Sequence, residues 1–146
     1  MIRPLTTTDK GIYLKLANEF YHSDAVLHAV AEHCMTNSFE EMMRSDNYLI
    51  GYIIECDSQC AGYAMLSKTF SPEVGGTCIW IEEIYILKDF RGKGLGKEFF
   101  EFIFDKFDGV SKRFRLEAIR ENVGAISLYN KLGFEELDYL QMVLDK

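Results

Sequence analysis

The chain has 146 residues, 48% of them hydrophobic, and a formal net charge of −7 at pH 7. Such a length suits one domain around one core, and the acidic balance argues against nucleic acid as a general partner. The sequence shows neither an apolar run long enough to cross a bilayer nor a secretory leader, so we expect one cytoplasmic domain over residues 1–146 with no membrane partner.

The first half of the chain predicts a strand, a helix and a β-hairpin. Thr8 or Asp9 can cap the helix, whose apolar residues recur on one face at Ile12, Leu16, Ala17 and Phe20. The hairpin turns at Asp57-Ser-Gln59. In chain order we expect a strand at 2–5, this helix, one or two short helices in a polar region at 21–46, strands at 48–56 and 61–67, and a loop at 70–76.

The histidines and cysteines give no metal-binding spacing. One histidine of the polar region could shuttle a proton, because imidazole titrates near neutrality, but exposed histidines on short helices are the simpler interpretation of His22, His28 and His33. Cys56 and Cys60 flank the hairpin turn, where a disulfide or a metal would be an alternative. With no pair of C-x-x-C units we expect no metal and four reduced thiols, at Cys34, Cys56, Cys60 and Cys78.

The segment Ile79–Gly96 is typical of a strand that runs into a glycine-rich loop and then into a helix. β-Branched and aromatic residues fill the strand, which we place at 77–87, and Arg91-Gly-Lys-Gly-Leu-Gly96 forms the loop. Apolar residues then recur at helical spacing, at Leu95, Phe99, Phe102, Ile103 and Phe107. Because a helix N-terminus presents free N–H groups and partial positive charge, this junction predicts a phosphate site.

The glycine spacing excludes two common nucleotide loops. Gly92, Gly94 and Gly96 do not supply the third glycine of a Rossmann G-x-G-x-x-G loop in register. A Walker A loop needs a hydroxyl after Gly-Lys, where this chain has Glu98. A glycine-rich turn without a ligand is the remaining alternative.

A second segment, Asn122–Phe134, predicts a short helix that stops at Gly133. Together the two segments resemble the GNAT superfamily of acetyl-CoA-dependent N-acetyltransferases. The R-x-x-G-x-G loop of that family is matched by Arg91, Gly94 and Gly96. Its later N-x-x-A-x-x-L-Y-x-x-x-G-F segment is matched by Asn122, Ala125, Leu128, Tyr129, Gly133 and Phe134.

The remaining elements complete the expected fold class, which is α/β (α+β). We expect the helix after Gly94 to end near Phe107, strands at 114–118 and 140–144, and the Asn122 helix between those strands. The resemblance implies a GNAT-like three-layer sandwich, in which helices flank a central mixed, mostly antiparallel sheet.

The resemblance also implies acetyl-CoA as co-substrate, without a metal. The loop would bind the pyrophosphate of coenzyme A through Arg91, Gly92, Lys93, Gly94, Gly96 and Lys97. The backbone of Ile84 and Ile86 would pair with the pantetheine amides as an added strand would. Asn122 would be a ligand on the pantetheine or adenosine side.

Acetyl transfer requires a neutral amine, yet a lysine-like amine has a pKa of about 10.4. Glu82 and Glu83 are the candidate bases, because they interrupt an apolar strand. Strand alternation puts them on opposite faces unless a bulge re-aims one. The resemblance favours Glu82, and the alternative is that both only shape substrate binding. Tyr129 is the candidate general acid toward the sulfur, because a phenol keeps its proton at neutral pH.

The acidic excess favours a small cationic amine as acceptor, such as a polyamine, an amino sugar or an amino acid. A protein N-terminus or lysine is an alternative acceptor, and a non-catalytic acyl-CoA-binding sensor is an alternative function. We expect acceptor contacts from Glu19, Phe20, Tyr21 and the loop at 70–76. The closing strand and the many aromatic residues make a homodimer a reasonable expectation.

Overall fold

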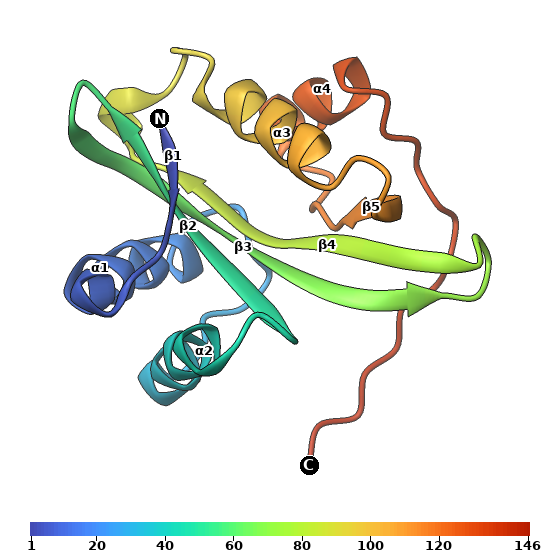
Figure 1. The fold of residues 1–146 in the computed structure, drawn as a ribbon, viewed down its shortest axis with the longest axis horizontal. Helices are drawn as coiled ribbons and strands as arrows, with labels where there is room; N and C mark the ends of the chain where they lie inside the picture. The colour runs from blue at the N-terminus through green and yellow to red at the C-terminus, as the bar shows by residue number, and fades with distance from the viewer.

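The computed structural model describes residues 1–146 and contains one five-stranded sheet with helices on both faces (Figure 1). The strand order is β1-β2-β3-β4-β5; neighbours are antiparallel except β4 and β5, which are parallel. The predicted three-layer sandwich with a mixed, mostly antiparallel sheet is therefore confirmed. The strands are β1 (Ile2–Pro4), β2 (Leu49–Cys56), β3 (Gln59–Ser71), β4 (Gly76–Ile86) and β5 (Ser111–Leu116).

Helices α1 (Lys10–Tyr21) and α2 (Glu32–Arg44) cover one face of the sheet, and α3 (Leu95–Lys106) and α4 (Val123–Lys131) cover the other (Figure 1). Each pair encloses a separate apolar core against the sheet. As predicted, α1 buries Leu16, Ala17 and Phe20, whereas Ile12 is only half-buried. None of the helices combines the length and the apolar character that a bilayer crossing requires.

Two hairpins join the three antiparallel strands β2, β3 and β4. Asp57 and Ser58 both have positive φ, 51° and 60°, which is the geometry of a tight two-residue turn and confirms the first hairpin. The loop predicted at 70–76 is wrong in its first two residues and in its last one. Phe70 pairs with Thr77 and Ser71 with Gly76, so β3 is longer than the sequence pattern indicated.

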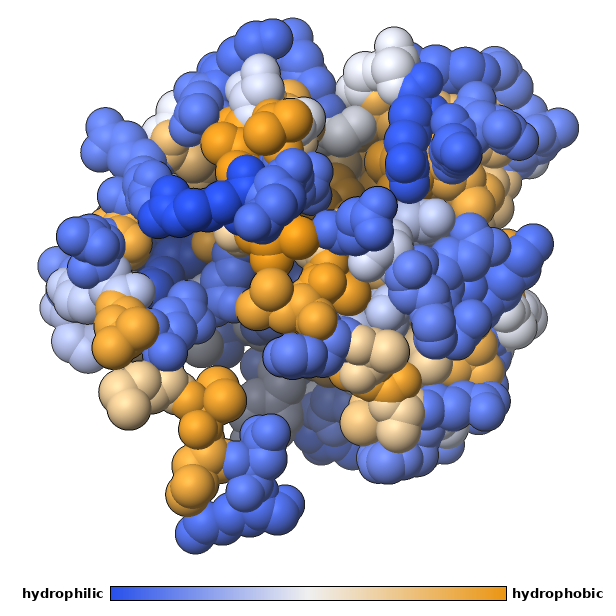
Figure 2. Space-filling view, turned by 180° about the vertical axis from the view of Figure 1, so that it is seen from behind, coloured by the Kyte–Doolittle hydropathy of each residue, from blue (hydrophilic) through white to orange (hydrophobic).

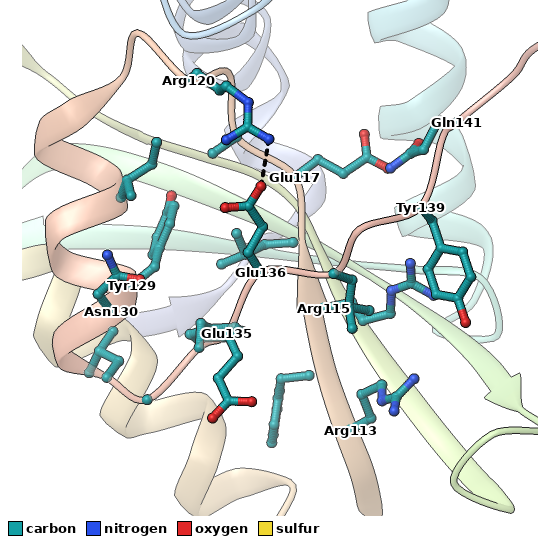
Figure 3. A pocket seen from close by; sticks show the side chains of 18 of the residues that line it. Arg113, Arg115, Glu117, Arg120, Tyr129, Asn130, Glu135, Glu136, Tyr139 and Gln141 are labelled. Atoms are coloured by element: carbon teal, nitrogen blue, oxygen red, sulfur yellow. Dashed lines mark hydrogen bonds and ion pairs between the residues drawn. The ribbon is translucent and has the colours of Figure 1, made fainter.

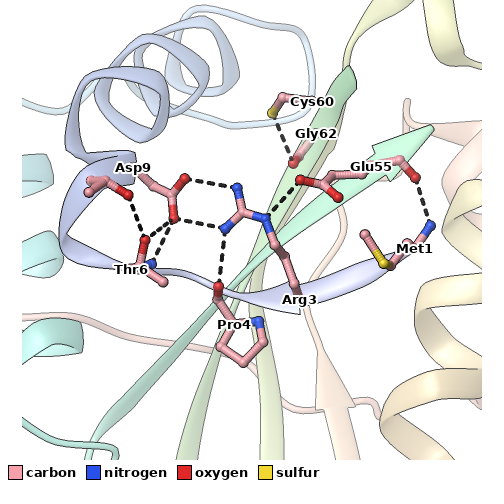
Figure 4. A network of polar contacts seen from close by, with 9 residues as sticks. Met1, Arg3, Pro4, Thr6, Asp9, Glu55, Cys60 and Gly62 are labelled. Atoms are coloured by element: carbon pink, nitrogen blue, oxygen red, sulfur yellow. Dashed lines mark hydrogen bonds and ion pairs between the residues drawn. The ribbon is translucent and has the colours of Figure 1, made fainter. Parts of the chain in front are cut away.

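A polar network fixes the start of α1 against the sheet (Figure 4). Asp9 lies in the 3₁₀ turn Thr7–Asp9 and is buried, and its carboxylate accepts two hydrogen bonds of 2.9 Å from the Arg3 guanidinium. The same carboxylate accepts the backbone N–H of Thr6 at 2.8 Å, which caps the turn. Arg3 also donates to Glu55 on β2 at 2.8 Å. This network joins β1, β2 and the helix that ends at Tyr21.

The closing strand predicted at 140–144 is wrong. Beyond Phe134 the chain runs to its C-terminus as an extended segment without a strand partner (Figure 1). Its apolar side chains are exposed, Leu140 and Val143 at 88%. Figure 2 shows a projection with apolar side chains at the lower left. A strand needs a neighbour to bond its backbone, and these residues reach no strand of their own chain. The edge of β5 is left uncovered.

Candidate active site

The site begins with a β-bulge in the middle of β4. Across the β3–β4 pair Leu66 lies opposite Ile81 and Met65 opposite Glu83, so Glu82 is an extra residue on β4. Before the bulge, Ile79 and Ile81 face the core under α3. After the bulge the alternation of side chains between the two faces is shifted by one residue, so Glu83 faces α1 and α2 instead.

Glu83 is a buried carboxylate held by two phenols. Its side chain is 6% exposed. Tyr63, which is fully buried on β3, donates to Oε2 at 2.6 Å, and Tyr21, the last residue of α1, donates to Oε1. Burial raises the pKa of Glu83 above its usual range, while the two phenol hydrogen bonds oppose that shift. Burial raises the pKa of Tyr21 and of Tyr63 as well, so both keep their protons.

Glu82 lies on the same side of the sheet, but it is exposed. Its carboxylate accepts a hydrogen bond from Ser67 on β3, the residue two places beyond Met65. Glu19 on α1 accepts a hydrogen bond of 3.3 Å from Tyr85, two residues after Glu83. The bulge therefore places Glu82 and Glu83 on the same side of the sheet, near Glu19 at the end of α1. Simple alternation would have put Glu82 and Glu83 on opposite faces.

The second feature is an open backbone edge on β4. Strand β5 accompanies β4 only as far as the pair Ile81–Leu116. The N–H of Leu87 points to β3, where it donates to Ala61 at 2.8 Å, so alternation turns the backbone groups of Ile84 and Ile86 the other way. The Arg91 guanidinium donates to the carbonyl of Ile86 at 2.9 Å, in agreement with this direction. The backbone groups of Ile84 and the N–H of Ile86 therefore face away from β3 beyond the end of β5, where an extended amide could pair with them.

The glycine loop follows this edge directly and leads into α3. Gly92 and Gly94 have φ of 76° and 82°, values that glycine adopts without strain. The first hydrogen bond of α3 runs from Glu98 N–H to the carbonyl of Gly94, which leaves the N–H groups of Leu95, Gly96 and Lys97 without intrahelical partners. An anion at this end of the helix would meet three free donors.

The basic residues of the loop differ in their contacts. The Arg91 guanidinium lies over the ring of Tyr85, 5.6 Å from its centroid, and the Lys93 ammonium lies 5.2 Å from that of Phe90. Lys97 forms a 3.3 Å ion pair with Glu101 on the same helix. All three residues are exposed.

Helix α4 packs closely on the start of α3 and carries Asn122 and Tyr129. A Cβ on Gly96 would lie 3.1 Å from Leu128, so the two helices nearly touch. Asn122 accepts the N–H of Ala125 at 3.4 Å through Oδ1 and so caps α4. The ring of Tyr129 packs against Phe100 and Phe134, and burial raises its pKa. Its hydroxyl makes no hydrogen bond within the chain, which leaves the phenol free to donate.

A cleft of about 690 Å³ lies between β5, α4 and the C-terminal segment (Figure 3). Tyr129, Arg115 and Tyr139 contribute to its walls, and an ion pair between Arg120 and Glu136 lies across it. Neither Glu82 nor Glu83 lines this cleft. It is the space beside the uncovered edge of β5, where a further strand would lie.

No histidine or cysteine belongs to the cluster formed by Glu19, Glu82 and Glu83. All three histidines are exposed, and His22 contacts only the carbonyl of Asn18, at 2.7 Å from Nδ1. The four cysteines are free thiols, and no cluster of three or more potential metal ligands is present.

Sequence reasoning missed two residues of the site, Tyr63 and Ser67. Both lie on β3 in a run of mostly apolar strand residues, where a tyrosine and a serine carry no local signal of function. Only the cross-strand register places them against Glu83 and Glu82.

Comparison with known proteins gives a consistent result. The model of the acetyltransferase (GNAT) family matches residues 13–134. A probable spermine N(1)-acetyltransferase of Bacillus subtilis subsp. natto is 33% identical over 90 residues, which are 57% of this chain and 59% of the relative. A thialysine N-epsilon-acetyltransferase of Mus musculus is 23% identical over 150 residues, which cover 93% of this chain and 84% of the relative. The match to the Bacillus protein therefore spans less than two thirds of that protein.

Solved structures share the fold. A possible acetyltransferase from Clostridium difficile 630 superposes with a TM-score of 0.81 at 20% identity, covering 100% of this chain and 97% of that one. The structure of AAC(6')-Iy in complex with a bisubstrate analog, CoA-S-monomethyl-acetylneamine, gives a TM-score of 0.79 at 20% identity with the same coverage.

Proposed function

This chain belongs to the acetyltransferase (GNAT) family, and on that premise we propose that it moves an acetyl group from acetyl-CoA to a primary amine by direct attack in a ternary complex. One observation carries the proposal. The β4 bulge presents Glu82 and Glu83 immediately before the open backbone edge at Ile84 and Ile86, and that edge leads into the glycine loop. An acyl donor on the edge would thus have carboxylates beside its reactive end.

The residues of the edge and the loop fit coenzyme A. The free N–H groups at the start of α3, with Arg91, Lys93 and Lys97, would bind the pyrophosphate, and the positive φ of Gly92 and Gly94 shapes the loop around it. Ile84 and Ile86 would bond the pantetheine amides. Asn122 already uses Oδ1 as a helix cap, so we assign only its Nδ2 group to the cofactor.

The chemistry assigns a role to each remaining group. Glu82 or Glu83 would accept the proton of the ammonium, and Glu82, being exposed, would also hold the cation directly or through water. The N–H of Ile84 would donate to the thioester carbonyl oxygen as negative charge develops there. Tyr129, protonated and without another hydrogen bond, would donate to the departing sulfur.

The acceptor we propose is a small cationic amine, such as a polyamine, an amino sugar or an amino acid. Three acidic side chains at the end of α1, Glu19, Glu82 and Glu83, favour a positively charged substrate over a neutral one. The relatives named for spermine and thialysine support this choice, because both names describe amines that carry positive charge at neutral pH.

The test is release of free thiol from acetyl-CoA over a panel of polyamines, amino sugars, amino acids and peptides, followed by the mass of the acetylated product. We expect at least one small cationic amine to raise thiol release well above hydrolysis. Acetylation of peptides alone would overturn the choice of acceptor. Tight binding of coenzyme A without transfer to any amine would identify an acyl-CoA sensor and contradict the enzyme.

We further propose that residues 1–146 act as one acetyltransferase domain in the cytoplasm and as a homodimer. The dimer is supported by the uncovered edge of β5 and by the exposed apolar segment that follows Phe134. The distal part of that segment runs away from its own β5, so we assign the C-terminal segment of a second copy to this edge.

A further inference from the structure

The burial of Glu83 raises a question that the proposed function leaves open. Its carboxylate is 6% exposed, and its two oxygens already accept hydrogen bonds from Tyr21 and Tyr63. A substrate amine therefore has no direct access to it. A carboxylate buried without a cationic partner is nevertheless costly to keep, and such groups gather at functional sites.

We propose that Tyr21 is a proton relay, which accepts the proton of the acceptor ammonium and passes its own phenolic proton to Glu83. The inference rests on the proposed function and concerns the same site. Of the two phenols on Glu83, only Tyr21 is accessible: it is half-buried at the end of α1, whereas Tyr63 is fully buried. Tyr21 is thus the single hydrogen-bonded connection from this carboxylate toward the substrate side.

The transfer balances without any further reactant. The ammonium N–H bond breaks as the proton moves to Tyr21 Oη, and the Oη–H bond breaks as that proton moves to Glu83 Oε1. The products are a neutral amine, a neutral Tyr21 and a protonated Glu83. The lone pair released on nitrogen then attacks the thioester carbonyl. As the amide forms, nitrogen loses a second proton to water, which restores the proton that Tyr129 gives to sulfur, and Glu83 later releases its own proton through Tyr21 to solvent.

The surroundings of Glu83 favour its role as proton acceptor. The groups that face it are Tyr13 and Tyr21 from α1, Tyr63 from β3 and Glu82 from β4, and none of them is a cation. Burial and the negative charge of Glu82 both raise the pKa of Glu83 above its usual range. A carboxylate of higher pKa is a stronger base, so its acceptance of a proton from an amine is less unfavourable.

The experiment compares three tyrosine-to-phenylalanine variants that each lose one hydroxyl. Tyr21→Phe should lower kcat by about a hundredfold, the lower end of the usual contribution of a proton-transfer group. Tyr63→Phe should reduce kcat far less, because it leaves the connection from Tyr21 to Oε1 intact. Tyr13→Phe is the matched control on the same helix; Tyr13 makes no hydrogen bond to Glu83 and should leave kcat unchanged.

A second readout separates the relay from a structural role. The kcat deficit of Tyr21→Phe should shrink as the acceptor amine is changed to one of lower pKa, which needs less help to lose its proton. Glu83→Gln should show a similar deficit, and the double variant should lose little more than either single variant. For Tyr21→Phe, thermal unfolding and coenzyme A affinity should stay close to those of the unaltered chain.

The outcomes are distinct. A Tyr21→Phe variant with unaltered kcat, or one whose deficit appears only in KM and is the same for all amines, overturns the relay and leaves the proposed function standing. An unaltered chain that acetylates no amine overturns both.

Discussion

Glu83 and Ile84 are adjacent in β4 but serve opposite sides of the molecule. The bulge at Glu82 turns the carboxylate of Glu83 toward Tyr21 and Tyr63, under α1. The backbone of Ile84 faces the gap where β5 has ended. A proton acceptor and a thioester site can therefore lie one residue apart and be reached from different faces of the sheet. This arrangement allows amine and cofactor to approach without displacing each other.

Tyr129→Phe should lower kcat by about one to two orders of magnitude and leave the affinity for coenzyme A nearly unchanged. The phenol makes no hydrogen bond within the chain and its ring packs on Phe100, so the substitution removes a proton donor and keeps the packing. Steady-state kinetics and a binding titration with coenzyme A check this. An unaltered kcat would remove Tyr129 from its role as general acid.

Gly94→Ala should weaken coenzyme A binding by about tenfold, because φ of 82° costs an alanine roughly 1–2 kcal/mol and the loop would shift to relieve it. Gly11→Ala is the matched control. Gly11 is exposed in α1, and a Cβ there meets nothing within 4 Å, so this variant should be more stable by about 0.5–1 kcal/mol with unchanged binding. Calorimetric titration with coenzyme A and thermal unfolding measure the two effects. Equal affinities for both variants would contradict the role of the loop conformation.

The sequence predicted the strand–loop–helix junction and the helix between Asn122 and Gly133, because both depend on local signals, namely apolar periodicity and glycines. It could not predict that Glu82 and Glu83 share a side. Nothing in Trp-Ile-Glu-Glu-Ile marks the extra residue, which is defined only by pairing with Met65 and Leu66 on β3. The roles of Tyr63 and Ser67 were missed for the same reason.

The failed closing strand illustrates the same limit. The apolar run at 140–144 has strand-like composition, but a strand also needs a partner edge within reach. In the single chain the run meets none, and its side chains are left in solvent.

Asp9→Asn should destabilise the protein by about 1–2 kcal/mol at pH 7, because it removes the charge held by the guanidinium of Arg3 while keeping the size of the cap. The salt bridge and the hydrogen bonds to Asp9 lower the pKa of its carboxyl. The stabilisation is therefore present above the unfolded-state pKa of about 4 and is lost as the pH falls through the depressed folded-state value.

Urea unfolding of Asp9→Asn and of the unaltered chain at pH 7 and pH 3 tests the prediction. The difference in their free energies of unfolding should be smaller at pH 3 than at pH 7. The matched control is Glu40→Gln, which breaks an exposed 3.8 Å ion pair with Lys10 and should change stability by less than 0.5 kcal/mol, roughly the error of the method. A gap that is the same at both pH values would indicate that the charge of Asp9 contributes nothing.

The dimer predicts a solution mass of twice 16.9 kDa, measured by light scattering on a sizing column. The double substitution Leu140→Glu and Leu144→Glu should give a monomer, because it replaces two exposed apolar side chains, which the dimer would bury beside β5, with charged ones. Leu27→Glu, at a residue that is also largely exposed but lies on the α1–α2 connection, should leave the dimer intact. A monomeric unaltered chain at micromolar concentration would contradict the dimer.

Glu83→Gln should remove a pH-dependent loss of stability while it impairs catalysis. Burial raises the folded-state pKa of Glu83 above the unfolded value, so the folded state binds this proton more tightly. The stabilising contribution of Glu83 is then fully present below its pKa in the unfolded state, and it is lost as the pH rises through its pKa in the folded state. Glutamine keeps the shape of the side chain and one hydrogen-bond acceptor for Tyr21 or Tyr63, but it has no charge.

The melting temperature of Glu83→Gln, relative to that of the unaltered chain, should therefore increase from pH 4 to pH 8. We expect roughly 2–4 °C for each kcal/mol of lost stability that the substitution removes. Thermal unfolding across this range measures the difference, and Glu82→Gln is the control, because an exposed carboxylate should show no such trend. A constant difference for Glu83→Gln would mean that its carboxylate is solvated and not the buried base that the relay requires.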